Sequence, residues 1–161
     1  MRDGQIDKNT DQLSRNYSLF TVNCSLLLMI LAFDYGTQKI GVASGNELLG
    51  TASPLKALPC KNTQPNWDDI AALLKEWEPE ALVVGLPLNM DGTDSESTAR
   101  AKKFAGRLKG RFGIKVWLVD ERLTTREARE RTGIQKADSR VDSMAAVIIA
   151  EGFWSEGGQP V

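Results

Sequence analysis

Acidic side chains stand at the ends of several predicted elements, and their spacing is the strongest indication of chemistry in this chain. They follow the predicted strands 28–33 and 115–119, and one more lies in the first turns of the last predicted helix. The acids are Asp34, Asp120, Glu121 and Asp142. Because neighbouring parallel strands end at one edge of a sheet, these elements can bring carboxylates together. Clustered carboxylates repel one another, so a cluster needs divalent cations or raised proton affinity to persist.

A carboxylate cluster predicts a particular kind of site. Oxygen ligands favour Mg²⁺ or Mn²⁺, and two such ions about 4 Å apart promote in-line attack of water on a phosphodiester. For any one acid alone a structural role is the commoner one. These alternatives are a turn cap for Asp34, a loop cap for Asp120, a surface pair with Arg122 or Arg126 for Glu121, and a helix N-terminus for Asp142. The shared position at element ends favours the metal site.

Composition narrows the function further. The chain of 161 residues contains no histidine, which excludes Ser-His-Asp and Cys-His catalysis, imidazole metal sites and histidine general bases. Cys24 and Cys60 fit no CxxC pattern, so neither a zinc site nor a disulfide framework is expected. Two lone cysteines are typical of a reducing cytoplasm. The apolar run 26–33 is too short to span a bilayer, and residues 1–23 lack the features of a signal peptide, so we expect a cytoplasmic protein without membrane contacts.

Basic residues are concentrated in one segment. Between Glu96 and Asp120 there is no acid, whereas seven residues are lysine or arginine. Arg100, Lys103 and Arg107 are spaced i, i+3, i+7 and therefore share one helix face. With a net charge of −1 for the whole chain, such a face indicates charge segregation that suits phosphate-backbone contacts. A solvated helix face and a partner-protein surface are the alternatives.

Further polar residues flank the proposed acids. Arg122 and Arg126 are placed to hold or polarise a phosphate. Asn89 lies in a loop after a predicted strand, on the same expected edge, where it can touch substrate or simply form a turn.

The periodicities predict an α/β domain. Strands are expected at 28–33, 40–44, 47–58, 81–86 and 115–119, and helices at 67–77, from Ser95 or Ser97 to 111, at 125–131, and at 138–154. Three strands in a meander followed by βαβ crossovers imply a mixed five-stranded sheet with helices on both faces. We expect residues 1–28 to be a disordered or dispensable extension, 29–155 the domain, and 156–161 a tail.

Four sequence blocks resemble a known family. AFDYGTQKIGVA, VVGLPLNMDGT, LVDERLTT and DSMAA occur in this order between about Met29 and Trp154, and together they resemble the YqgF/RuvX family of Holliday-junction-resolvase-like nucleases. The resemblance implies an RNase H-like fold and a metal-dependent nuclease that processes the 5′ end of precursor 16S rRNA. It also implies that Asp34, Glu121 and Asp142 are the catalytic metal-binding acids, with Asp120 as an adjacent candidate ligand.

The sequence therefore predicts a metal-dependent endonuclease that uses Mg²⁺ or Mn²⁺ and acts on structured RNA in ribosome biogenesis. Three alternatives are kept: a Holliday-junction-type DNA resolvase, a non-catalytic RNA-binding ribosome-assembly factor, and phosphate-loop ATPase chemistry. The last needs two lobes around a nucleotide, which one short domain does not supply. The oligomeric state, monomer or dimer, stays open.

Overall fold

The computed structural model describes residues 29–123 and 141–161. Predictions for the extension 1–28, for the helix 125–131 and for Arg126 lie outside these residues.

Four long strands form the middle of the sheet. They are β1 (Met29–Tyr35), β2 (Lys39–Asn46), β6 (Ala81–Leu86) and β7 (Lys115–Asp120). β1 pairs antiparallel with β2, and parallel with β6, which in turn pairs parallel with β7. Their apolar runs arise because this sheet is covered on both faces. The predicted hairpin and the mixed α/β architecture are confirmed.

The edges of the sheet differ from the prediction. The described residues contain eight strands instead of five, because β3 (Thr51–Pro54), β4 (Leu58–Lys61), β5 (Gln64–Pro65) and β8 (Gln159–Pro160) extend it. The single outer strand expected at 47–58 is divided into β3 and β4, which both pair with β2, and between them the Leu55 N–H donates to the Val42 carbonyl. β4 and β5 pair with each other, and the expected tail holds β8, which pairs with β7.

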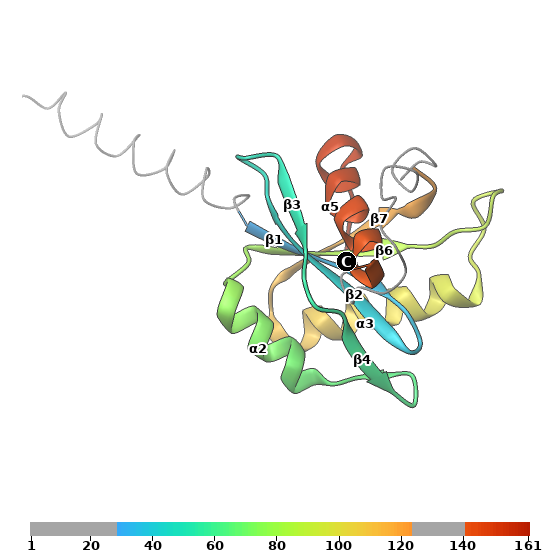
Figure 1. The fold of residues 1–161 in the computed structure, drawn as a ribbon. Coiled ribbons are helices and arrows are strands. Elements are labelled where there is room, and N and C mark those ends of the chain that lie inside the picture. Colours follow the sequence, from blue (N-terminus) through green and yellow to red (C-terminus); the bar gives the residue numbers. More distant parts are fainter. Residues whose placement is uncertain (1–28, 124–140) are drawn as a thin grey trace, which may run out of the picture.

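The described helices lie on both faces of the sheet (Figure 1). α2 (Trp67–Trp77) and α3 (Glu96–Phe112) lie on one side of the sheet, and α5 (Met144–Glu156) lies on the other. α2 has the predicted bounds, with the Asn66 side chain accepting from the Asp68 N–H. α3 begins with a reciprocal capping box between Ser95 and Thr98 and ends at Gly113 in the left-handed conformation, as such residues favour.

Side chains of β1 alternate between two cores. Leu31 and Phe33 pack with the α2 and α3 side chains, whereas Ile30 and Ala32 pack with those of α5. Since successive strand residues point to opposite faces, Asp34 faces the α5 side and Tyr35 the α3 side, where Tyr35 packs against the core.

The last helix begins later than predicted. Val141–Ser143 form a 3₁₀ turn, η2, and the α-helix starts at Met144 instead of Asp138. Asp142 therefore precedes α5 instead of lying within it. The buried Ser143 hydroxyl oxygen accepts a hydrogen bond from the Val42 N–H at 3.1 Å, which ties this turn to β2. A second 3₁₀ turn, η1 (Glu121–Leu123), follows β7.

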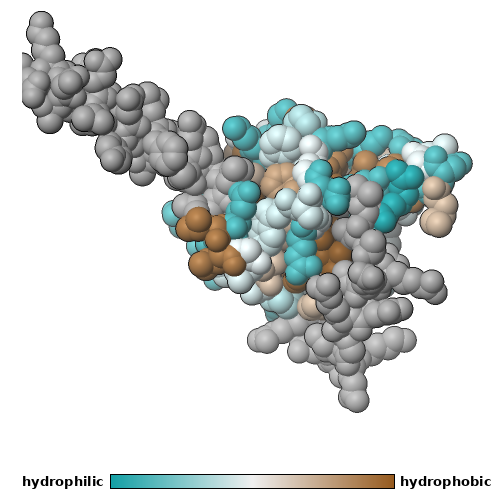
Figure 2. All heavy atoms as spheres, turned by 90° about the horizontal axis from the view of Figure 1, so that it is seen from above, coloured by the Kyte–Doolittle hydropathy of each residue, from teal (hydrophilic) through white to brown (hydrophobic). Residues whose placement is uncertain are grey.

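The surface is mostly polar. The face drawn in Figure 2 is largely hydrophilic or intermediate, with brown in separate patches. Large exposed apolar side chains among the described residues are Leu48, Leu49 and Met90. None of the helices in this part of the chain is long and apolar enough to cross a membrane.

Candidate active site at the end of strand β1

Asp34 lies between two glycines on the α5 face of the sheet. It pairs with Gly41 on β2, and continuing the register in which Phe33 faces Val84 brings Gly85 of β6 to its other side. A β-carbon on Gly41 would lie 2.3 Å from the Asp142 carbonyl oxygen, and one on Gly85 would lie 2.5 Å from Glu121 Oε1. The two missing side chains therefore leave the space in which Glu121 and the Asp142 turn approach Asp34.

This arrangement brings Asp34, Glu121 and Asp142 to one face and one end of the sheet. They come from β1, η1 and η2 respectively. The elements were predicted to meet at this edge, and β1, β6 and β7, being mutually parallel, do end there.

The acids are not drawn together into a finished metal site. Among residues 29–123 and 141–161, no three His, Cys, Asp or Glu side chains are close enough to hold a metal ion. Asp142 Oδ2 instead accepts from Lys39 Nζ at 2.9 Å, an ion pair whose side chains are 60% (Lys39) and 42% (Asp142) exposed. The carboxylates fit Mg²⁺ or Mn²⁺ by donor type, and the Lys39 ammonium supplies a neighbouring positive charge.

Asp120 is separated from the other acids. Val116 and Leu118 of β7 belong to the α2–α3 core, so alternation places Asp120 on that side and Glu121, one residue on, over Gly85. The Asp120 carboxylate accepts from Arg122 Nη2 at 2.7 Å and from Arg122 Nε at 3.1 Å. These hydrogen bonds hold the pKa of Asp120 below its ordinary value.

The loop after β6 is closed by its own polar side chains. Asn89 Nδ2 donates to Thr93 Oγ1 at 2.9 Å, and Asp91 Oδ1 accepts from the Thr93 hydroxyl at 2.6 Å. Hydrogen bonds from Thr93 lower the pKa of Asp91. Arg122 Nη1 lies 3.2 Å from where a Gly92 β-carbon would be, so the arginine packs behind the loop. Asn89 thus stabilises the loop in this structure, and Arg122 joins the loop to Asp120.

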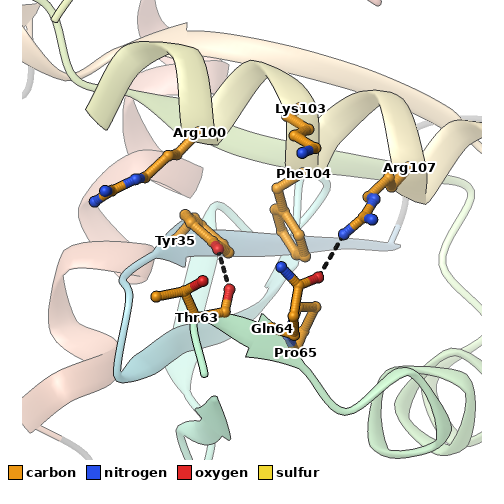
Figure 3. A pocket seen from close by; sticks show the side chains of 8 residues that line it. All are labelled: Tyr35, Thr63, Gln64, Pro65, Arg100, Lys103, Phe104 and Arg107. Carbon is orange, nitrogen blue, oxygen red and sulfur yellow. Dashed lines mark hydrogen bonds between the residues drawn. The ribbon is translucent and has the colours of Figure 1, made fainter. Parts of the chain in front are cut away.

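Three basic residues that share one face of α3 line a cavity on the opposite side of the sheet (Figure 3). Its volume is about 150 Å³. Arg107 Nη1 donates to Gln64 Oε1 at 2.6 Å, and Arg100 pairs with Glu96 one turn away on α3. The lining residues are Tyr35, Thr63, Gln64, Pro65, Arg100, Lys103, Phe104 and Arg107. The shared helix face predicted for Arg100, Lys103 and Arg107 is therefore present, and it forms one wall of the cavity.

Sequence reasoning missed the other side of this cavity. The Tyr35 hydroxyl donates to the Thr63 carbonyl at 2.6 Å, and burial, followed by the Cys60 thiol, raises the pKa of Tyr35. Tyr35 could have been found from the strand alternation that follows Asp34. No local pattern marks Thr63 or Gln64, because a two-residue strand brings them there.

Comparison with known proteins finds one matching family and similar curated proteins. A profile described as "RuvX: Holliday junction resolvase" matches residues 28–156. A curated Alcanivorax borkumensis protein named "Putative pre-16S rRNA nuclease" is 91% identical over 127 residues, covering 79% of this chain and 96% of that protein. A protein of the same name from Aeromonas salmonicida is 56% identical over 132 residues, covering 79% and 94%.

A solved structure resembles the fold. It is titled "T. thermophilus RuvC in complex with Holliday junction substrate", is 13% identical, covers 83% of this chain and 99% of that chain, and has a TM-score of 0.50. This likeness establishes the predicted RNase H-like fold. Because the family profile spans most of the chain and curated relatives match over nearly their whole length, the chain belongs to the RuvX family.

Proposed function

We propose that this protein is a metal-dependent endonuclease that hydrolyses phosphodiester bonds in the 5′-end processing of precursor 16S rRNA, in the cytoplasm, during ribosome biogenesis. The observation that carries the proposal is the convergence of Asp34, Glu121 and the Asp142 turn over the glycines of neighbouring strands. The names of the curated relatives support the same reaction and substrate.

Each acid has a distinct place in the proposed site. Asp34 lies on the rigid central strand, where its backbone is paired to β2. Glu121 reaches over Gly85 from the end of β7, and Asp142 is carried by a turn that Ser143 ties to β2. Together they would hold Mg²⁺ or Mn²⁺, which supplies Lewis-acid polarisation of the phosphate and a nucleophilic water when bound. Asp120 fits a supporting role better, since it orients Arg122.

Positive side chains would hold the substrate backbone. Arg100, Lys103 and Arg107 line the cavity beside β1, and Arg122 stands at the end of β7 with one face on the Asn89 loop. Arg126, beyond the described residues, would add a further cation. Such contacts neutralise phosphates without reading sequence.

The decisive experiment compares cleavage by the wild-type protein and by Asp34→Asn. Purified full-length protein is incubated with Mg²⁺ or Mn²⁺ and a labelled precursor 16S rRNA fragment. We expect Asp34→Asn to cut at least about 100-fold more slowly. Mutation of residues that only hydrogen-bond a metal ligand already lowers activity roughly 10- to 100-fold, and loss of a ligand itself should cost more. Asp68→Asn makes the same change on the exposed start of α2 and should leave the rate unchanged. Equal rates for wild type and Asp34→Asn would reject the acid assignment.

Branched DNA is a second candidate substrate, because the family description refers to Holliday junctions. A four-way DNA junction therefore runs in parallel with the RNA. If the junction is cleaved faster than the RNA, branched DNA becomes the proposed substrate in place of RNA. Retained RNA binding with no cleavage of either substrate would favour a non-catalytic assembly factor.

A further inference from the structure

The cavity beside Tyr35 carries excess positive charge. Of its three cations, Arg100 pairs with Glu96, whose own side chain is 80% exposed, and Arg107 bonds only the neutral Gln64 among the described residues. Lys103 has no hydrogen-bond or ion-pair partner among the described residues. An anion that entered the cavity would meet two uncompensated cations in a chain whose net charge is −1.

The remaining walls combine the aromatic rings of Tyr35 and Phe104 with a turn that is held against them. Tyr35 stacks on Phe104 with ring centroids 5.0 Å apart and planes 29° apart. The turn opposite contains Asn62 and Thr63, both non-glycine residues with positive φ, at 51° and 61°. Such conformations cost free energy and persist only where surrounding contacts determine them. The hydrogen bond from Tyr35 to the Thr63 carbonyl is one such contact, so the turn is held against the aromatic wall.

Cations next to aromatic rings are the combination that binds single-stranded nucleic acids, in which phosphates meet the cations and bases or sugars pack on the rings. A duplex would offer its phosphates equally well, but its bases would remain stacked inside.

The position of the cavity distinguishes these two occupants. Tyr35 directly follows Asp34, so their α-carbons are about 3.8 Å apart, yet they face opposite sides of the sheet. A nucleic acid that touches both sites must pass around the end of β1, from one face of the sheet to the other. Duplexes have a persistence length near 50 nm and do not turn so sharply, whereas a single strand does.

We therefore propose that the Tyr35 cavity binds a nucleotide of a single-stranded RNA segment flanking the cleaved bond, and that this strand passes around the end of β1 to reach the acids. This inference rests on the proposed nuclease function, and it adds the substrate class: RNA that is single-stranded next to the cut.

Binding in the absence of divalent ions tests the cavity independently of cleavage. Fluorescence anisotropy in EDTA compares a labelled single-stranded RNA with a blunt duplex of the same sequence. We expect Lys103→Gln to weaken single-strand binding about five- to tenfold and to reduce the salt slope by about 0.7, with a clearly smaller loss for the duplex. Lys115→Gln removes the same charge at the opposite end of the sheet and should alter neither. Equal effects of the two variants, or equal losses for strand and duplex, would overturn the proposal.

Cleavage tests the path of the strand. RNA substrates with a single-stranded flank of increasing length are compared with a flankless duplex. We expect the flank to raise kcat/KM about tenfold in the wild type, and Lys103→Gln to lower kcat/KM for the flanked substrate more than for the flankless one, so that most of this gain is lost. A flank without effect in the wild type refutes the path. If no RNA is cut at all, the nuclease function fails, and the anisotropy result still decides whether the cavity binds single strands.

Discussion

At the scale of single residues, Gly41 and Gly85 matter because of the side chains they lack. A β-carbon at Gly85 would lie 2.4 Å from Ile149 Cδ1 and 2.5 Å from Glu121 Oε1, both far inside normal contact. The missing side chain of Gly85 therefore allows α5 to pack against the sheet, and it also allows Glu121, a proposed catalytic acid, to lie over β6.

Gly85→Ala should damage stability and activity at once. Overpacking of this kind costs about 1–3 kcal/mol of unfolding free energy, and cleavage should fall because Glu121 is displaced. Urea denaturation and the RNA cleavage assay measure the two effects. Gly110→Ala is the control, because nothing lies within 4 Å of its added β-carbon and alanine favours a helix by up to about 1 kcal/mol. Unchanged stability and activity in Gly85→Ala would contradict the described geometry.

Lys39 pairs with the Asp142 carboxylate, one of the groups proposed to hold a metal ion. Its ammonium is 2.9 Å from Asp142 Oδ2, and exposed pairs of this kind are worth up to about 1 kcal/mol. Lys39→Gln should therefore bind Mn²⁺ more tightly, by up to about fivefold, as measured by isothermal titration calorimetry. Lys56→Gln, an exposed change between β3 and β4, is the control. Weaker Mn²⁺ binding in Lys39→Gln would mean that the lysine positions the carboxylate for the ion.

At the scale of elements, the loop after β6 and the end of β7 are coupled through Arg122. Its guanidinium bonds the Asp120 carboxylate and packs behind Gly92. The pKa of Asp120 is depressed by these bonds, so their stabilisation is present above the unfolded-state value, about 3.9, and is lost as the pH falls through the depressed value.

Arg122→Gln should lower the melting temperature by about 2 °C at pH 7, and the difference should close below about pH 3. Differential scanning calorimetry across this pH range measures it. In a double-variant cycle, Asp120→Asn should remove most of the effect of Arg122→Gln. A difference that persists at low pH would show that the arginine acts through the loop instead of the ion pair.

Elements with strong local signals were predicted well, and those made by tertiary pairing were not. The α2 bounds follow from its apolar stripe and the Asn66 cap, and the α3 start follows from the Ser95–Thr98 box. By contrast, β5 and β8 have two residues each, too few for any periodicity, and exist because an edge is available. The late start of α5 has the same origin, since the Ser143 hydroxyl bonds the β2 backbone.

The candidate site was predictable in outline. Acids at the ends of three elements indicated the edge where Asp34, Glu121 and Asp142 gather. The placement of Asp120 on the other face of the sheet required the register of β7 and the burial of Val119 on the α5 side. The cavity face of α3 was visible as a helical spacing, but its partner turn was not, because Thr63 and Gln64 approach only through the pairing of β4 with β5.

At the scale of the whole molecule, the C-terminal residues add a short edge strand to the sheet. β8 pairs with the edge of β7, the Val161 N–H donates to the Val116 carbonyl at 3.0 Å, and Val161 packs against the α2–α3 core. The segment expected to be a tail is therefore part of the fold, and it covers an edge that would otherwise invite pairing with another chain.

Removal of residues 159–161 should lower the unfolding free energy by about 1–2 kcal/mol, from lost hydrogen bonds and apolar burial. Thermal denaturation measures the loss, and light scattering should detect association through the uncovered β7 edge. Gln159→Ala keeps the backbone pairing and should behave as the wild type. A truncated protein with unchanged stability and no association would mean that β8 contributes nothing to the fold.

The alternation of Asp34 and Tyr35 along β1 has a consequence for how this chain tolerates insertions and deletions. Even-numbered residues of β1 face the side of the proposed acids, and odd-numbered residues face the side of the basic cavity. Adding or removing one residue upstream in β1 would exchange the two sides, sending the carboxylate toward α3 and the aromatic ring toward α5. Length changes in this strand are therefore expected to be accommodated only in pairs.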